Sequence, residues 1–388
     1  MNRSAPTGGI AHPDYGLSAL RIAHIGHKIV PSRQGGVEIV VEELATRFAA
    51  KGHHVDVYNR KQRSQKRLTH YYKGVNLLTS FTFDNKNLNA LVYSFVATLT
   101  AVQEKYDIIH FHAEGPAAMI WLPSLLGFRT IATIHGLDWQ RDKWGGLATK
   151  YIKFGEKVAA KYADEIIVLS PVMQTYFKTT YGRDTTFIPN GVNEPIYRAP
   201  NLITKYGLRK DGYILFLARI VPEKGLHKLL TAFKQVDTGI KLVVAGSSAY
   251  TNEYYSLITK LANEDSRVIL TGHVEGQELQ ELFTNCLFYC LPSDVEGMPI
   301  SLLEAMSYGR QCLISDIPES TQVAGQYATT FKRGNVSDLA EKLKAKIGTN
   351  SNFTPEDISS FVLQNYNWDK IASATEKLYR GEYAYSSS

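Results

Sequence analysis

The feature that most constrains the fold is an alternation of short, apolar, β-branched runs with helical patterns. After Leu20 such runs occupy Arg21–Ile25, His54–Tyr58, Asp107–Phe111, Thr130–Ile134 and Glu165–Leu169. Turn residues cluster at 188–200, and the alternation then restarts with Tyr213–Leu217, Lys241–Ala245, Val268–Leu270, Leu287–Leu291 and Gln311–Ile314. This alternation predicts βαβ units and, in each half of the chain, a parallel sheet covered by helices on both faces.

The chain has 388 residues, which is longer than a domain with a single hydrophobic core usually is, so two tandem domains are expected. We expect a flexible leader at 1–19, an N-terminal α/β domain at 20–193, a C-terminal α/β domain at 194–365, and a helix and tail at 366–388. Apolar residues at helical spacing predict a helix after Gly36 and a last helix near 368–379. Doubly wound sheets bind ligands outside the carboxyl ends of their strands, which predicts a cleft between the domains.

Composition is that of an ordinary soluble protein, with 44% hydrophobic and 21% charged residues. The N-terminus lacks the apolar core of a secretory signal. The longest apolar windows, 88–102 and 117–128, are shorter than the roughly 20 residues of a membrane span. Cys286, Cys290 and Cys312 fall in apolar stretches, which favours reduced, buried thiols over disulfides or a zinc site. We therefore expect a cytoplasmic protein.

The net charge of +6 arises in the N-terminal half. The stretch from Arg60 to Lys73 is rich in Lys and Arg, and no acidic residue lies between Asp56 and Asp84. Two interpretations remain open: contact with anionic lipid or a phosphate-bearing acceptor, or a solvated loop. No nucleic-acid partner is expected.

The most informative segment is 293–306, where Glu296 and Glu304 lie eight positions apart across a predicted loop-to-helix junction. Backbone amides of Gly297, Met298 and Ile300 would point from the helix N-terminus toward an anion. The two carboxylates can accept hydrogen bonds from sugar hydroxyls. A diphosphate-linked sugar satisfies both demands.

At these residues the chain resembles the GT-B glycosyltransferases, and within them the retaining family 4, whose E-x7-E motif matches Glu296 and Glu304. The resemblance covers nearly the whole chain and implies two Rossmann-like domains that face each other across a cleft. It implies that Glu304 contacts the donor ribose and Glu296 the transferred sugar. The residues that it places along the donor pocket are Gly297, Met298 and Pro299.

Two cations, Arg219 and Lys224, follow the predicted strand 213–217 at a spacing of five. The resemblance implies that they clamp the donor diphosphate. Fixed cations stabilise the charge of a departing diphosphate, so no metal ion is required. Without the glutamate motif, the same spacing would favour a solvated surface.

The loop 26–36 after the first predicted strand ends in Gly35 and Gly36, which let backbone approach a phosphate closely at a helix start. It is not the G-x-G-x-x-G of dinucleotide binders and is too long for that turn. A donor loop is favoured over NAD binding.

His135 follows another predicted strand end, and the resemblance implies that it contacts the transferred sugar. The polar and aromatic residues after it suit the acceptor side of the cleft, because Trp and Arg stack against sugars and pyrophosphate. These acceptor-side candidates are Asp138, Trp139 and Arg141.

His110 and His112 share one face of the predicted strand 107–111 and its end, which could suggest a metal pair. No carboxylate or cysteine completes an evident ligand set. A D-x-D-like motif is also lacking in a suitable place, so no metal site and no cofactor is expected.

Together these features predict a retaining, metal-independent glycosyltransferase. It would move a sugar from a nucleotide-sugar donor to a glycan or polyprenyl-diphosphate-linked acceptor in bacterial polysaccharide biosynthesis, as a cytoplasmic or peripheral membrane protein. Two rivals remain: a GT-B nucleotide-sugar 2-epimerase, which needs no acceptor, and a non-catalytic nucleotide-sugar-binding protein.

Overall fold

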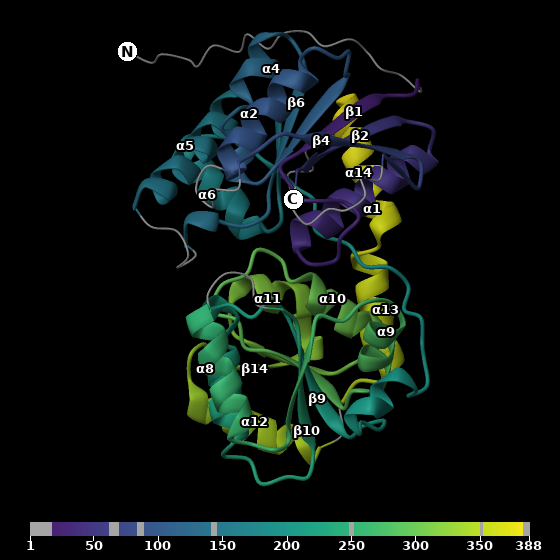
Figure 1. The fold of residues 1–388 in the computed structure, drawn as a ribbon, viewed down its shortest axis with the longest axis vertical. Helices are drawn as coiled ribbons and strands as arrows, with labels where there is room; N and C mark the ends of the chain where they lie inside the picture. Colours follow the sequence, from purple (N-terminus) through teal and green to yellow (C-terminus); the bar gives the residue numbers. More distant parts are fainter. Residues whose placement is uncertain are drawn as a thin grey trace.

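The computed structural model describes residues 18–61, 70–83, 89–140, 146–247, 252–349 and 352–382. Two sheets, one in each half of this part of the chain, form two lobes that stack along the long axis of the molecule (Figure 1). Helices cover both faces of each sheet. The structure is therefore the predicted pair of α/β domains.

The N-terminal sheet has the strand order β3-β4-β2-β1-β5-β6-β7-β8, and only β3 runs antiparallel to its neighbour. Its strands are β1 (Arg21–Ile25), β2 (His54–Arg60), β3 (Tyr71–Tyr72), β4 (Val75–Ser80), β5 (Ile108–His112), β6 (Arg129–Ile134), β7 (Glu165–Val168) and β8 (Thr186–Phe187). Its helices are α1 (Gly36–Ala50), α2 (Asn89–Ala101), α3 (Glu114–Ala117), α4 (Trp121–Leu125), η1 (Asp138–Gln140), α5 (Gly146–Tyr162) and α6 (Pro171–Tyr181).

The C-terminal sheet is parallel throughout, in the order β11-β10-β9-β12-β13-β14. Its strands are β9 (Tyr213–Leu217), β10 (Lys241–Ala245), β11 (Val268–Gly272), β12 (Phe288–Leu291), β13 (Cys312–Ser315) and β14 (Ala328–Phe331). Its helices are η2 (Leu202–Tyr206), η3 (Pro222–Lys224), α7 (Leu226–Phe233), α8 (Asn252–Asn263), α9 (Gly276–Asn285), α10 (Ile300–Ser307), α11 (Pro318–Ala324), η4 (Gly325–Tyr327), α12 (Val336–Ile347) and α13 (Pro355–Asn365).

Every strand predicted from the sequence is present, with ends no more than two residues from those expected. The strands that were not predicted are β3, β4, β8 and β14, which lie at or next to a sheet edge. They are short or only partly buried, so they lack the continuous apolar run of a central strand. The predicted helix after Gly36 is α1, which packs Val41, Leu44 and Phe48 into the core.

The last helix, α14 (Trp368–Arg380), returns to the N-terminal lobe, while the preceding α13 stays in the C-terminal lobe (Figure 1). Trp368 and Tyr379 of α14 join the same core cluster as Phe48 of α1. The two chain crossings between the lobes meet where the amide of Val192 donates to the carbonyl of Tyr366 at 2.6 Å. This pairing ties the interdomain linker to the start of α14.

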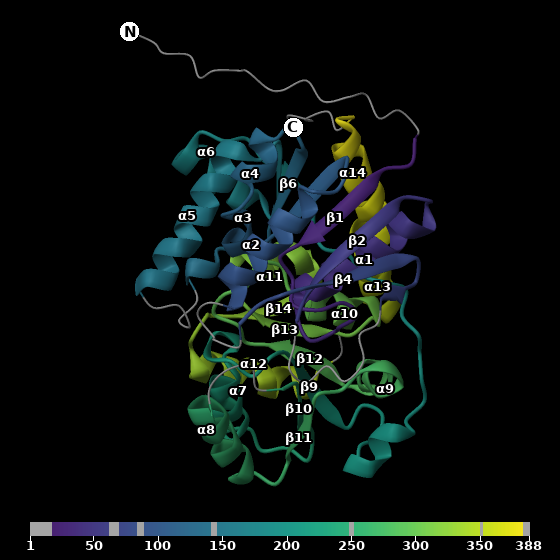
Figure 2. The same cartoon turned by 45° about the horizontal axis from the view of Figure 1, so that its top comes forward.

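In both sheets the order of the strands reverses near the centre, between β1 and β5 in the first and between β9 and β12 in the second. In the tilted view, α10 and α11 lie at the side of the C-terminal domain that faces the N-terminal domain (Figure 2). Cys286, Cys290 and Cys312 are buried free thiols, as predicted. None of the described helices combines the length and the apolar character that crossing a bilayer requires.

Candidate active site

The strand order of the C-terminal sheet reverses between β9 and β12, and ligands of such sheets bind beyond the carboxyl ends of the strands at this point. After β9 the chain passes through η3 and enters α7 at Gly225, whose φ of +67° is left-handed. A Cβ atom on Gly225 would lie 2.0 Å from the carbonyl oxygen of Pro292. Glycine thus lets the loop that carries Lys224 lie against the loop that carries Glu296.

Lys224 and Glu296 form a salt bridge at this point. The Nζ atom of Lys224 lies 2.5 Å from Oε1 and 2.6 Å from Oε2 of Glu296, and the two side chains are 15% and 6% exposed. The hydroxyl of Ser293 donates to Oε1 at 2.6 Å. Charge-assisted hydrogen bonds of this length hold both groups in one geometry. The structure brings together two residues that the sequence separates by 72 positions.

Arg219 lies in the same loop, two residues beyond β9, and is partly exposed. Its guanidinium donates no hydrogen bond to the residues that the structure describes. Arg219 therefore differs from Lys224, because its charge is available to an anion without breaking a protein contact.

The glutamate motif spans the entrance of α10. Glu296 precedes the helix, Pro299 is its N-cap with extended backbone, and Glu304 lies in its second turn. Met298 is buried, and its carbonyl accepts a hydrogen bond of 3.1 Å from the side chain of Asn190 in the linker. The interdomain linker therefore holds this junction.

Glu304 contacts the N-terminal domain through Arg33 of the loop 26–36. Arg33 Nη2 lies 3.5 Å from Oε1 of Glu304, and Arg33 Nη1 lies 2.8 Å from Oε1 of Glu43 on α1. Burial raises the pKa of the Glu304 carboxyl, Arg33 lowers it, and Glu43 raises it again. One arginine thus bridges two carboxylates across the domain boundary.

The loop 26–36 enters α1 through Gly35 and Gly36. A Cβ atom on Gly35 would lie 2.1 Å from Oε2 of Glu38, whose Oε1 accepts from the Lys28 amide at 3.0 Å. Gly36 lies close to Ile300 at the start of α10, since a Cβ there would be 3.7 Å from its Cδ1. The small residues let the loop fold back on its own helix and meet the opposite domain.

His135 also meets the C-terminal domain. A Cβ atom on Gly297 would lie 1.7 Å from the carbonyl oxygen of His135, so the two backbones touch across the cleft. His135 follows β6 and is partly exposed. The predicted sugar-contacting residues, His135 and Glu296, are therefore brought to one place.

The acceptor-side candidates Asp138 and Trp139 lie on η1, which begins three residues after His135, and both are partly buried. The backbone amide of Asp138 donates to the buried carboxyl of Glu114 at 2.9 Å, and the Trp139 indole donates to Glu156 at 3.2 Å. Burial, reinforced by Asp138, raises the pKa of Glu114 well above its usual range. The third candidate, Arg141, lies outside the described residues.

His110 and His112 do face the same side of β5, and the structure adds a third histidine, His24 on β1. One ring nitrogen from each lies within 4.8 Å of the others, which is close enough for metal ligands. However, every ring nitrogen except Nε2 of His24 already has a hydrogen-bond partner. We assign no metal to these residues.

Sequence reasoning missed Arg33, Glu43, Asn190 and His24. Arg33 lies in the predicted donor loop, and its charge was the signal that could have found it. Glu43 and Asn190 acquire their roles only through contacts with distant segments. His24 lies inside an apolar strand, where a lone histidine carries no distinctive pattern.

Two family models together match most of the chain. Glycosyltransferase Family 4 matches residues 34–194, and Glycosyl transferases group 1 matches residues 200–352. These matches coincide with the two lobes of the structure.

Curated relatives are glycosyltransferases. The uncharacterized glycosyltransferase YqgM of Bacillus subtilis is 29% identical over 58% of this chain, a match that spans 62% of YqgM. The uncharacterized glycosyltransferase MJ1178 of Methanocaldococcus jannaschii is 22% identical over 89% of this chain and 94% of its own. UDP-Gal:alpha-D-GlcNAc-diphosphoundecaprenol alpha-1,3-galactosyltransferase of Escherichia coli is 27% identical over 55% of this chain and 59% of its own.

Solved structures share the fold. Sucrose-phosphate synthase from Thermosynechococcus elongatus superposes with a TM-score of 0.80 at 19% identity, over 94% of this chain and 99% of its own. The Anabaena protein HepE in complex with UDP-glucose superposes with a TM-score of 0.74 at 17% identity, over 92% of this chain and 99% of HepE. The chain is therefore a glycosyltransferase of the GT-B fold and of the family 4 type, which takes its sugar from a nucleotide-sugar donor.

Proposed function

We propose that this glycosyltransferase works with retention of anomeric configuration and without a metal ion, on a lipid-linked acceptor in bacterial polysaccharide biosynthesis. The observation that carries the proposal is the salt bridge of Lys224 and Glu296 beyond the strand ends of the C-terminal domain, where Gly297 meets His135 and Arg219 belongs to the same loop as Lys224. Arg219, Lys224 and Glu296 provide two cations for a diphosphate and one carboxylate for a sugar. They suit both halves of a nucleotide-sugar donor.

Donor binding exchanges partners at this salt bridge. The phosphate oxygens draw Lys224 away from Glu296, and the carboxylate then accepts hydrogen bonds from sugar hydroxyls. The bond between the anomeric carbon and the phosphate oxygen breaks, and its electron pair stays on the diphosphate. The acceptor oxygen bonds to the anomeric carbon from the same face, and its proton passes to the leaving phosphate.

Arg219 and Lys224 are the groups that favour this step without a metal ion. Preorganised cations stabilise the negative charge that grows on the leaving group as the bond breaks. Contact of the two domains at His135 and Gly297 excludes water that would otherwise hydrolyse the donor. No protein nucleophile is assigned.

The proposed acceptor is attached to a membrane lipid, and the Escherichia coli relative acts on a diphosphoundecaprenol-linked sugar. Leu91, Phe95 and Leu99 recur every four residues on α2 and are 36%, 48% and 36% exposed. Phe81 and Phe83, which precede this helix, are about half exposed. We propose that this apolar surface and the basic stretch 60–73, of which 62–69 lie outside the described residues, hold the protein peripherally on the cytoplasmic membrane face.

Co-sedimentation with vesicles tests the membrane contact, using phosphatidylglycerol mixed with phosphatidylcholine. Replacing Arg63, Lys66 and Arg67 with glutamine should lower binding, since each cation contributes about 1 kcal/mol at an anionic surface. Phe95→Ser should lower binding at high salt, where the charge contribution is screened. Unchanged binding of both variants at low and high salt would remove the proposal.

Donor and reaction are tested in two steps. A thermal-shift screen comes first, with UDP-glucose at its head because HepE binds it, since a donor at 100 times its dissociation constant stabilises by about 2.7 kcal/mol. The donor found is then incubated with polyprenyl-diphosphate-linked acceptors in EDTA, and the anomer of the product is determined. Inverted product, or loss of transfer in EDTA, would overturn the proposal. Epimerised or hydrolysed donor in the absence of acceptor would favour the 2-epimerase, and binding without turnover a non-catalytic protein.

A further inference from the structure

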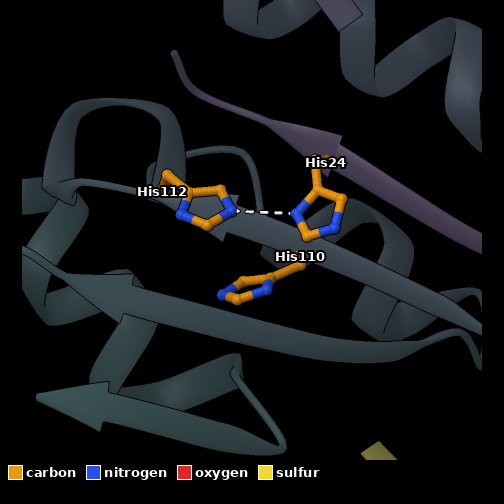
Figure 3. Close-up of side chains that lie close together, drawn as sticks. All are labelled: His24, His110 and His112. Carbon is orange, nitrogen blue, oxygen red and sulfur yellow. Dashed lines mark hydrogen bonds between the residues drawn. The ribbon is translucent and has the colours of Figure 1, made fainter. Parts of the chain in front are cut away.

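The buried histidines of the N-terminal domain form a hydrogen-bonded chain that ends in the active site. His24 on β1 and His112 on β5 are fully buried, and their rings lie beside each other with His110 below them in the view of Figure 3. His24 Nδ1 lies 3.0 Å from His112 Nε2, and His112 Nδ1 lies 3.2 Å from His135 Nε2. The chain therefore runs from the domain core to the partly exposed His135.

A metal ion is a poor occupant of this cluster. Both ring nitrogens of His110 are already bound, to the hydroxyls of Tyr379 at 2.6 Å and Thr133 at 2.7 Å. A divalent ion would also break the bond between His24 and His112. No described carboxylate joins the group to balance a buried double charge, and such a charge is costly in a protein interior.

The two buried members of the chain, His24 and His112, are uncharged, so their protons can be placed. Burial lowers the pKa of His24 to about 3 and that of His112 well below its usual value, and neighbouring histidines lower both further. A neutral imidazole has one N–H and one bare nitrogen. The two hydrogen bonds of the chain can therefore have only two arrangements. Either both N–H groups point toward His135, or both point away from it.

His24 decides between these directions, because its Nε2 atom is buried without a partner among the described residues. If the chain donated away from His135, His24 would carry its proton on Nε2 as an orphaned N–H. Unpaired buried donors are rarer than unpaired acceptors. His24 therefore donates from Nδ1 to His112, and His112 donates from Nδ1 to His135.

We propose that His24 and His112 are positioning residues that hold His135 as the neutral tautomer with its proton on Nδ1. His135 then offers an N–H to a hydroxyl of the transferred sugar and adds no positive charge beside a sugar ring that itself becomes positive. This inference rests on the proposed function for the sugar contact of His135. The tautomer itself does not depend on it.

Nitrogen NMR of the full-length protein labelled with [15N]histidine tests the tautomer, with His135→Gln used to assign the signals. In the wild type, Nδ1 of His135 should give the protonated signal and Nε2 the bare one. His24→Phe removes the first donor and should shift His135 toward the opposite tautomer. His24→Asn places an amide N–H near the Nδ1 position and should restore it. His110→Asn changes an equally buried histidine outside the chain and should leave the His135 signals unchanged.

Single-turnover transfer completes the test. Turnover of His24→Phe should fall about tenfold with little change in donor affinity, and His24→Asn should recover most of it, because one neutral hydrogen bond is at stake. If the wild-type spectrum showed His135 protonated on Nε2, the inference would be overturned. Unchanged His135 signals in folded His24→Phe would also overturn it. If His135→Ala keeps full transfer while the wild-type tautomer is as expected, the proposed sugar contact fails and the histidine chain stands.

Discussion

The two sides of the cleft are built from opposite kinds of polar group. The C-terminal side carries charges, with Lys224 and Glu296 in a short salt bridge and Arg219 in the loop that leads to Lys224. The N-terminal side carries imidazoles, with His135 at the end of a chain through His112 and His24, and burial lowers the pKa of both His112 and His24.

This difference matches the charges that the proposed reaction creates on the diphosphate and on the sugar of the donor. The leaving diphosphate becomes more negative, so cations on its side lower the barrier. The sugar ring becomes positive, and a neutral N–H can hold a hydroxyl without opposing that charge.

Arg219→Ala should have the largest effect, lowering turnover by about a hundredfold or more because phosphate charge grows in the transition state. Lys224→Ala should behave similarly, while donor affinity falls less in both. Arg219 has no protein acceptor among the described residues, so its variant should keep the melting temperature. Lys234→Ala, which breaks only the exposed pair with Glu264, is the matched control. Wild-type turnover of Arg219→Ala would mean that this charge is unused.

Gly297→Ala should disturb the contact between the two sides. Its Cβ would lie 1.7 Å from the His135 carbonyl, so the backbones must move apart. Misplacement of reacting groups by about 1 Å can cost roughly a hundredfold in rate. Gly239→Ala is the control, because a Cβ there meets nothing within 4 Å. Small-angle scattering with donor bound measures the separation of the lobes, and equal turnover of the two variants would contradict the expected role of the contact.

Glu304→Gln should weaken donor binding with little change in turnover, since the ribose is bound alike in ground and transition states. Losing a charged hydrogen bond costs about 1.5–3 kcal/mol, or roughly ten- to a hundredfold in affinity. Donor titration by calorimetry measures it, with Glu253→Gln on the surface of α8 as the control. A loss confined to turnover would show that Glu304 acts in the chemical step.

Glu376→Gln should have the smallest effect, on stability alone. Burial raises the pKa of Glu376, but hydrogen bonds from Lys51 and Arg380 outweigh it and lower the pKa to about 2. A lowered folded-state pKa stabilises the fold above the ordinary glutamate pKa, and the contribution is lost as the pH falls toward 2.

For a pair so close to solvent, the loss should be about 1 kcal/mol at neutral pH. Urea unfolding at several pH values measures it, with Glu341→Gln on the exposed face of α12 as the control. A difference from wild type that stays constant down to pH 2 would contradict the assigned ion pairs.

The order of strands and helices was predictable because buried parallel strands and their covering helices have distinct hydrophobic periods. The central strands, such as β1, β9 and β12, were therefore found. The edge strand β3 and its neighbour β4 were missed, because pairing with a neighbour, and not their own apolar pattern, makes them strands. The return of α14 to the N-terminal core depends on contacts with α1 that local sequence does not encode.

For the site, local motifs supplied the candidates: Arg219, Lys224, Glu296 and His135 follow strands, and Glu304 lies within α10. Tertiary structure alone decided their partners. Arg33 meets Glu304 although 271 positions separate them, and His24 meets His112 across 88. The physical reason is that a strand or helix records its own period and caps in sequence, whereas a hydrogen bond between distant segments depends on how the two domains and their sheets pack.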